Sequence, residues 1–280
     1  MTNPDVTLSL SKGVFELERG DGPLVISAPH VGTFVPDELA ARLTPPGRAL
    51  VDTDWFADRL YPFAGQLGAT VLRALRSRYV VDLNRDPSGA TLYPGARTTG
   101  LCATETFEGE PLYAAGDEPS YDEIAIRRAL CFDPYHDALA GELARIKRVH
   151  GYALLLDAHS IWSPLPLLFD GELPDVNVGT NSGRSCERNL ADAVAHVVAA
   201  SPYAYVVDGR FKGGYITRRY GNPAHAVHAI QLEINQKTYL ADGSRTAWDE
   251  AKAGRLSVVL RAVCNALLAT APKHSTSASP

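Results

Sequence analysis

The sequence predicts an α/β fold: a three-layer α/β/α domain with a mixed, mostly parallel central sheet. The clearest observation is the stretch at 151–160, GYALLLDAHS, in which an uninterrupted apolar run ends abruptly at Asp157. A short apolar run of this kind is typical of a strand that is buried on both faces. Expected strands and helices also alternate along the chain, without internal repeats or an inter-domain linker. We therefore expect residues 1–271 to form one domain, followed by a Ser-rich, disordered tail at 272–280.

The first part of the chain supplies several strands and only short helices. Apolar runs and alternating patterns predict strands at residues 14–18, 24–28, 69–74 and 79–85. Pro36 and the acids after it open a short helix. Acidic residues also begin a helix at Asp52, which Pro62 limits. The segment 86–119 is rich in Gly, Pro and Thr, and a loop of that length is usually functional or mobile.

The second part supplies the long helices. A capping box at Ser120-Tyr-Asp-Glu123 begins a helical region that Pro134 is expected to split and that Gly151 ends. Amphipathic spacing predicts further helices at 186–200 and 246–269. Strands are expected within 151–160 and at 176–179, 203–208 and 229–234, with a Gly-hinged loop or hairpin at 210–218.

Composition favours a cytoplasmic enzyme. The 280 residues carry a net charge of −5 and no basic block, so no charge pattern points to nucleic acid. No apolar run approaches the roughly 20 residues of a membrane span, and the N-terminus lacks the pattern of a signal peptide. The four cysteines are scattered singly, which predicts neither a disulfide framework nor a thiolate zinc site.

Polar side chains follow several of the predicted strands at their carboxyl ends, where open α/β sheets bind ligands. They are His30, Asn84-Arg85, Asp157 with His159, and Glu233, and Asp54 lies at a helix start. Any one of them could be a turn cap or a salt-bridge partner, but so many indicate one shared site.

Two imidazoles and a carboxylate form a typical ligand set for catalytic zinc, which keeps a fourth position for water. His30, His159 and one acid meet that need, although another divalent metal would also suit them. Glu233 could then act as general base, taking a proton from water and passing it to a leaving amine. The sequence has no H-E-x-x-H motif, so these are not the ligands of that protease class.

The chain resembles the N-formylglutamate amidohydrolases (N-formylglutamate deformylases) of histidine degradation, from about Leu24 to Tyr239. The matching stretches are Ala28-Pro-His-Val-Gly32, Asp52-Thr-Asp-Trp55, Ser77-Arg-Tyr-Val-Val-Asp-Leu-Asn-Arg85, Leu156-Asp-Ala-His-Ser160, Gly209-Arg-Phe-Lys-Gly-Gly214, Ile216-Thr-Arg-Arg-Tyr-Gly221 and Gln231-Leu-Glu-Ile234. Each stretch alone is a weak signal, but their order and spacing are specific.

The resemblance implies a fold similar to that of zinc carboxypeptidases and aspartoacylases, which use His-x-x-Glu and a distant His as ligands. Here Thr33 stands where that Glu would be, so the acidic ligand must come from elsewhere. Asp54 is the first candidate and Asp52 the second, whereas Asp157 is expected to orient His159 or cap a turn. His228 is considered as a substitute ligand.

The resemblance also implies a small dicarboxylate substrate, which needs fixed cations. Arginine grips a carboxylate with a planar fork, so Arg85, Arg210 and Arg218 are candidates for substrate binding. Asn84 is a neutral donor beside Arg85, and Arg78 is a catalytic candidate that would stabilise the oxyanion or, alternatively, bind the substrate. Asn181 and Tyr215 are further candidates.

Three alternatives remain open at this point. The enzyme could act on another N-acyl amino acid, such as N-formylaspartate. The chain could be a non-catalytic metal or amino-acid binding protein, although a pure binder has no need of Glu233. A serine hydrolase using Ser160 is set aside because the sequence has no G-x-S-x-G motif. The native metal and the oligomeric state are not determined by the sequence.

Overall fold

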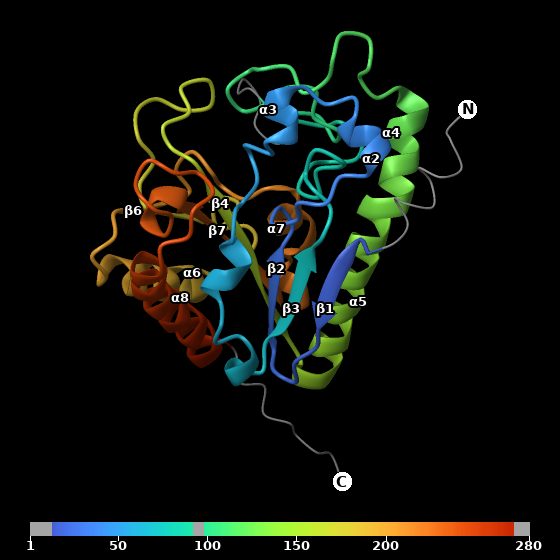
Figure 1. The fold of residues 1–280 in the computed structure, drawn as a ribbon. Coiled ribbons are helices and arrows are strands. Elements are labelled where there is room, and N and C mark those ends of the chain that lie inside the picture. Colours follow the sequence, from blue (N-terminus) through green and yellow to red (C-terminus); the bar gives the residue numbers. More distant parts are fainter. Residues whose placement is uncertain (1–12, 92–97, 272–280) are drawn as a thin grey trace.

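A computed structural model describes residues 13–91 and 98–271. The predicted tail at 272–280 lies outside these residues. The described chain contains a seven-stranded sheet in the order β1-β3-β2-β4-β7-β5-β6 (Figure 1). The strands are β1 (Phe15–Glu18), β2 (Leu24–Ala28), β3 (Thr70–Ala74), β4 (Ala153–Ile161), β5 (Val176–Gly179), β6 (Tyr205–Val207) and β7 (Val227–Asn235).

The sheet is mixed and mostly parallel, as predicted. β3, β2, β4 and β7 form a continuous parallel centre. β1 runs antiparallel to β3, β5 runs antiparallel to β7, and β6 pairs parallel to β5. The two central strands β4 and β7 are almost entirely buried, which explains their continuous apolar runs.

Helices cover both faces of the sheet and complete the three layers. The long helices are α5 (Asp133–His150), α6 (Arg188–Ala199) and α8 (Glu250–Thr270). Leu155 of β4 packs in one core with Leu139 and Ile146 of α5, whereas Leu156 packs in a second core with residues of α6 and α8. Figure 1 shows α5 on one side of the sheet and the α6–α8 pair on the other.

The remaining elements are short. They are α2 (Asp37–Ala40), α3 (Pro45–Arg48), α4 (Tyr121–Arg127), α7 (Tyr215–Tyr220), the 3-10 helices η1 (Ala57–Leu60), η2 (Gly65–Leu67), η4 (Pro223–His225) and η5 (Gln236–Thr238), and the π-helix η3 (Arg128–Phe132). Most of them lie in the connections that follow the carboxyl ends of the strands or join one layer to another.

Helix α8 is long and apolar enough to span a membrane by length and composition alone. Its side chains Leu256, Leu260, Val263 and Leu267 are buried in the core beneath the sheet, next to α6. These contacts identify α8 as a core helix of the domain rather than as a membrane anchor.

Several predicted elements differ from the structure, in whole or in part. The helix expected from Asp52 is replaced by turns and by the 3-10 helix η1, so Asp54 precedes that short helix and does not lie at the start of an α-helix. The apolar residues 79–85 form turns instead of a strand; Val80 is fully buried, but its carbonyl accepts from Arg127 rather than from a neighbouring strand. The helical region is divided just before Pro134, where the π-helix η3 separates α4 from α5, and Pro134 itself lies in the first turn of α5, where no N–H is required. Of the loop or hairpin expected at 210–218, the structure has a loop as far as Gly214, and residues 215–218 belong to α7.

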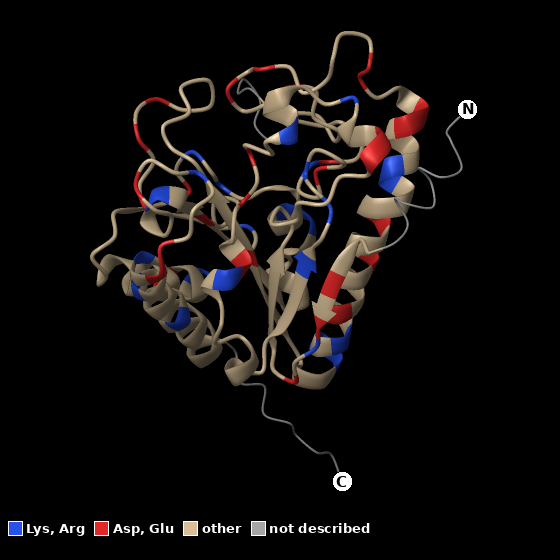
Figure 2. Ribbon diagram, in the orientation of Figure 1, with Lys and Arg blue, Asp and Glu red and all other residues tan. Residues whose placement is uncertain are grey.

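Charges along α5 follow the helix dipole. Asp133 lies in its first turn, and Lys147, Arg148 and His150 lie in its last turn, where Gly151 ends the helix at a φ of 80°. Figure 2 shows this basic cluster at the lower end of α5, with both signs of charge mixed over the rest of the visible surface.

Candidate active site

The candidate site lies at the carboxyl ends of β2, β4 and β7. Every second side chain of β4 and β7 faces the layer of α5 and α7. On that face the first half of each strand is apolar, and the second half carries Asp157 and His159 on β4 and Gln231 and Glu233 on β7. His159 and Glu233 are direct partners in the parallel register, so their side chains leave the sheet side by side.

The strand β4 is longer than the sequence predicted. Its pairing with β7 continues as far as Ile161, opposite Asn235. Asp157 and His159 therefore lie within the strand rather than in a turn after it, which gives both side chains a rigid backbone.

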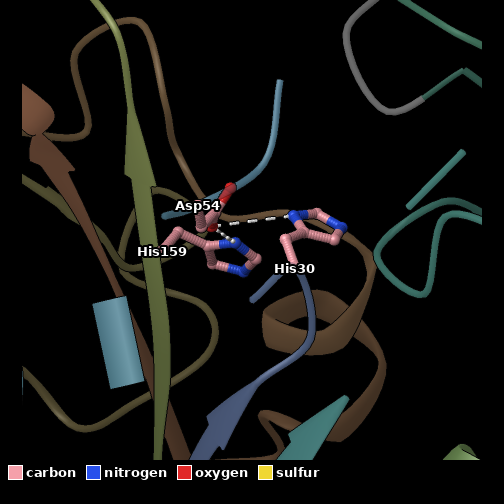
Figure 3. A group of neighbouring side chains, drawn as sticks. All are labelled: His30, Asp54 and His159. Atoms are coloured by element: carbon pink, nitrogen blue, oxygen red, sulfur yellow. Dashed lines mark hydrogen bonds and ion pairs between the residues drawn. The ribbon is translucent and has the colours of Figure 1, made fainter. Parts of the chain in front are cut away.

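Three of the predicted residues, His30, Asp54 and His159, meet in one buried cluster (Figure 3). One nitrogen of each imidazole and one oxygen of the carboxylate lie within 4.8 Å of one another. His159 Nδ1 lies 3.1 Å and His30 Nδ1 lies 3.8 Å from the same oxygen, Asp54 Oδ2. Both imidazoles thus turn their Nδ1 atoms toward one carboxylate oxygen.

The choice between Asp54 and Asp52 follows from the turn that carries both. The Asp54 backbone N–H donates to the His30 carbonyl (3.1 Å), and Asp54 Oδ2 accepts from the Ser160 N–H (3.0 Å). These bonds hold Asp54 between β2 and β4. The Asp52 carboxylate instead accepts from the Phe107 N–H at 2.9 Å, outside the cluster.

The second ring nitrogen of each imidazole, Nε2, lies within hydrogen-bond distance of a carboxylate. His30 Nε2 lies 2.7 Å from Asp82 Oδ1, and His159 Nε2 lies 3.0 Å from Asp157 Oδ1. Metal-ligating histidines usually donate their second ring N–H to such a carboxylate, which fixes the ring orientation and leaves the first nitrogen free to bind. The pattern favours Nδ1 as the ligand atom of both His30 and His159.

Electrostatics differ between the two imidazoles. Burial opposes a charge on His159, but Asp157 and Asp54 outweigh it and raise the pKa of this imidazole well above its usual value. Burial and the nearby Arg78 lower the pKa of His30. The two pKa shifts therefore run in opposite directions, and binding of a metal ion requires an unprotonated ring nitrogen on each imidazole.

Asp82 is one of the residues of this site that the sequence analysis did not single out. Arg78 donates to Asp82 Oδ2 (2.8 Å) and to Asp54 Oδ1 (3.4 Å), so one guanidinium joins the candidate ligand Asp54 to the partner of His30. Burial works against ionisation of Asp82, but Arg85, His30 and Arg78 hold its pKa well below its usual range. The sequence signal that could have identified Asp82 is its position two residues before Asn84, within a stretch that matches the family.

Glu233 lines a cavity of about 110 Å³ beside the cluster. Its side chain is buried, and burial is the largest effect that raises the pKa of this carboxyl to about 8; Asp54 adds to the rise and His159 opposes it. A carboxyl with a raised pKa in a cavity is a candidate for proton transfer near neutral pH.

The cavity also brings most of the predicted arginines together. Arg78, Arg85 and Arg210 line it with Asn84, and Ile161, Leu168 and Phe211 form an apolar wall. The Arg78 guanidinium lies 4.7 Å from the centre of the Phe107 ring. Arg85 donates to Thr99, and Arg210 Nε donates to the Leu168 carbonyl at 2.7 Å. The contacts with Thr99 and Leu168 therefore hold the Arg85 and Arg210 guanidinium groups in place.

Arg218 is not among the residues that line this cavity. Its Nε donates to the Gly213 carbonyl at 2.8 Å, which holds the guanidinium against the loop before α7. Arg218 is thus not among the arginines that line the cavity, and its role in substrate binding stays a prediction.

Asn84 reaches the cavity from a turn rather than from a strand end. Its Oδ1 accepts from the Ile216 N–H at 2.7 Å, and its Nδ2 lies 2.9 Å from His159 Nε2. A Cβ atom on Gly214 would lie 2.3 Å from Asn84 Nδ2, so this contact requires glycine. The amide oxygen is already bonded to Ile216, and the NH2 group faces His159.

The other candidates lie elsewhere. His228 pairs with Leu154 near the start of β7, five residues before Glu233, and its Nδ1 accepts from the Glu187 N–H at 3.3 Å. The substitute-ligand interpretation of His228 is therefore wrong. Asn181 and Tyr215 do not line the cavity.

Ser160 borders the cavity without a catalytic partner. Its hydroxyl bonds to the Tyr239 hydroxyl (2.7 Å) and to Gln236 Nε2 (3.3 Å). No histidine among the described residues is bonded to its Oγ, in agreement with setting the serine hydrolase aside.

The donor set fits a divalent metal. Two imidazole nitrogens and one carboxylate oxygen converge, the imidazoles are oriented by carboxylates, and Glu233 and a cavity lie alongside. Such a site on the sheet ends of a three-layer domain defines the class of protein, an α/β hydrolytic enzyme.

Comparison with known proteins identifies the family. Residues 22–240 match the family model of N-formylglutamate amidohydrolase, and the chain belongs to this family. It is 49% identical to the N-formylglutamate deformylase of Pseudomonas aeruginosa and 47% identical to that of Pseudomonas putida. Each match covers 91% of this chain and 96% of the relative.

Solved structures agree with the fold. The N-formylglutamate amidohydrolase of Ralstonia eutropha JMP134 superposes with a TM-score of 0.75 at 27% identity, over 91% of this chain and 97% of that one. A gene product of Agrobacterium tumefaciens shares the fold with a TM-score of 0.70 at 15% identity, over 93% and 97% of the two chains. The predicted family and fold class are confirmed.

Proposed function

We propose that this enzyme hydrolyses N-formyl-L-glutamate to formate and L-glutamate, with Zn²⁺ or a similar divalent metal at His30, Asp54 and His159. The observation that carries the proposal is the convergence of these three residues and Glu233 around one cavity. The choice of substrate rests on the two Pseudomonas relatives, both of which are N-formylglutamate deformylases. The assignment of the reaction to histidine degradation in the cytoplasm stays a prediction from the sequence.

A bound divalent metal would polarise the formyl carbonyl and make water more acidic. Asp82 and Asp157 hold His30 and His159 in place, so the cluster needs little rearrangement to accept the ion. Arg78 lies beside Asp54 and borders the cavity, where its guanidinium can donate to a developing oxyanion.

Glu233 performs the proton transfers in this proposal. Its carboxylate takes a proton from the attacking water and delivers it to the nitrogen of the leaving amine. Among the described residues, two carboxylates line the cavity, Glu233 and Asp86. Asp86 lies on the loop, two residues beyond Asn84, whereas Glu233 lies beside the cluster of candidate metal ligands. Glu233 is therefore the candidate for proton transfer.

Turnover is the direct test of the proposed function. The purified chain, loaded with Zn²⁺, is expected to release L-glutamate and formate from N-formyl-L-glutamate in equal amounts. N-formylaspartate is assayed in parallel, since faster turnover of this shorter substrate would replace the proposed one. No amine release from either compound by the metal-loaded protein would contradict the proposal.

We expect one metal ion per chain. His159→Ala removes a nitrogen donor and should lose the ion on dialysis, as measured by elemental analysis. Asp54→Ala should also lose most of it. His228→Ala is the matched control, because this buried histidine lies at the other end of β7 and should keep full occupancy. Full occupancy in Asp54→Ala would instead point to Asp52.

Activity should rise with pH, because Glu233 must be ionised to accept a proton. Without an ion its pKa is raised to about 8, and a nearby divalent cation favours the charged carboxylate and lowers that value. The ascending limb of kcat/KM should therefore have its midpoint below about 8. A profile recorded from pH 5 to 9 that stays flat would contradict this role for Glu233.

A further inference from the structure

We propose that Gln231 is a positioning residue that holds the Glu233 carboxylate in the orientation needed for proton transfer. This inference rests on the proposed role of Glu233 as general base. Gln231 lies two residues before Glu233 on β7, so both side chains leave the same face of the strand. Gln231 is 3% exposed, and its Nε2 donates to Glu233 Oε2 at 3.0 Å.

The direction of this hydrogen bond is fixed from the other end of the amide. Gln231 Oε1 lies 2.7 Å from the backbone N–H of Gly214, which can only donate. The carbonyl oxygen must therefore face Gly214, and the NH2 group must face Glu233. A flipped amide would bring two donors together at Gly214 and two acceptors together at Glu233.

Gly214 is itself held in place. It packs against the Asn84 side chain so closely that a Cβ atom would collide with the amide, and Asn84 Oδ1 is bonded to the Ile216 N–H at the start of α7. A line of contacts thus runs from α7 through Asn84 and Gly214 to Gln231, and ends at Glu233. The strand pairing of β7 with β4 and β5 fixes the backbone on both sides.

The contact engages only one oxygen of the base. Among the residues that the structure describes, no side chain donates to Glu233 Oε1, and Glu233 borders the cavity. The neutral amide orients the carboxylate without placing a cation beside it. Oε2 is held, and Oε1 is left as the oxygen that accepts the proton.

Gln231→Met tests the inference, because methionine keeps the length of the side chain and removes both hydrogen bonds. We expect kcat to fall roughly 10- to 100-fold, the scale of a misplaced catalytic group, with KM changed less than about twofold. Metal content should stay at one per chain. An unchanged kcat would overturn the proposal.

Gln231→Glu separates positioning from a merely structural role. It keeps an acceptor for the Gly214 N–H but replaces the donor to Glu233 by a carboxylate. If Gln231 only supported Gly214, this variant would be active; loss of kcat in both variants supports the contact with Glu233. Asn235→Ala is the matched control, since this buried amide lies two residues after Glu233 and bonds to the Leu173 carbonyl instead.

A double-mutant cycle distinguishes failure of this inference from failure of the proposed function. In a Glu233→Gln background, Gln231→Met should cost no further kcat, because the group it positions is already gone. Additive losses would contradict action through Glu233. A wild-type kcat in Glu233→Gln would exclude Glu233 as general base. A large loss of kcat in Glu233→Gln, with an unchanged kcat in Gln231→Met, would exclude only the positioning role of Gln231.

Discussion

Replacing Glu233 by glutamine is expected to lower kcat by roughly 10²- to 10⁴-fold, the usual contribution of acid–base catalysis. Glutamine has nearly the same shape but accepts no proton near neutral pH. KM should change little, because the cations of the cavity remain. The measurement is steady-state release of L-glutamate by the metal-loaded variant.

The metal content of Glu233→Gln decides how the loss is interpreted. Glu233 is not part of the cluster of His30, Asp54 and His159, so the variant should keep one ion per chain. Loss of the ion would make Glu233 a ligand, and unchanged kcat would remove it from the mechanism. Glu142→Gln is the matched control, because this buried carboxylate on α5 binds Arg19 and Arg145 away from the cavity.

The sequence predicted the core of the site because that part depends on strands. His30 follows β2, and His159 and Glu233 lie in β4 and β7, whose apolar runs are visible in the sequence. Parallel neighbours bring their carboxyl ends to one edge of the sheet. The meeting of His159 and Glu233 therefore follows once the two strands are recognised as neighbours.

The parts that the sequence left open lie in turns and loops. Asp52 and Asp54 are only two residues apart, and bonds to His30 and Ser160, distant in the chain, decide between them. Asp82 lies between two turns, inside an apolar stretch that predicted a strand. Local patterns carry no information on such contacts, since these depend on segments that meet only in the folded chain.

The arginines show the same division. Their residue type indicated carboxylate binding, but motif membership could not tell Arg210, which lines the cavity, from Arg218, which bonds to the Gly213 carbonyl outside it. The two are eight positions apart and are separated by Gly213 and Gly214, so their membership in neighbouring motifs does not tell which of them lines the cavity.

Replacing Arg85 or Arg210 by alanine is expected to lower kcat/KM for N-formyl-L-glutamate by roughly 10²- to 10³-fold. Truncating one partner of a buried, hydrogen-bonded charge pair costs about 2–5 kcal/mol. Each arginine lines the cavity and is held by a loop contact, so each can face one carboxylate of the substrate. Lysine should not restore activity, because it lacks the planar fork.

Substrate selectivity gives the sharper form of this prediction. The formyl group is small, so the two carboxylates carry most of the features by which the enzyme can recognise its substrate. N-formylglutamine and N-formylmethionine should be poor substrates of the wild type, and the variant that has lost the cation for the side-chain carboxylate should discriminate least between N-formylglutamate and N-formylglutamine. That variant identifies which arginine faces the side chain.

Two further arginines on α7 complete the experiment. Arg219→Ala is the matched control, since this exposed residue contacts Tyr220 outside the cavity. Arg218→Ala separates two expectations. Because Arg218 does not line the cavity, kcat/KM should be nearly unchanged; if Arg218 binds substrate, as its motif suggests, the loss should be as large as that of Arg85→Ala. Comparable kcat/KM of the wild type for all three formyl compounds would exclude recognition through two carboxylates and indicate a general N-acyl amino-acid hydrolase.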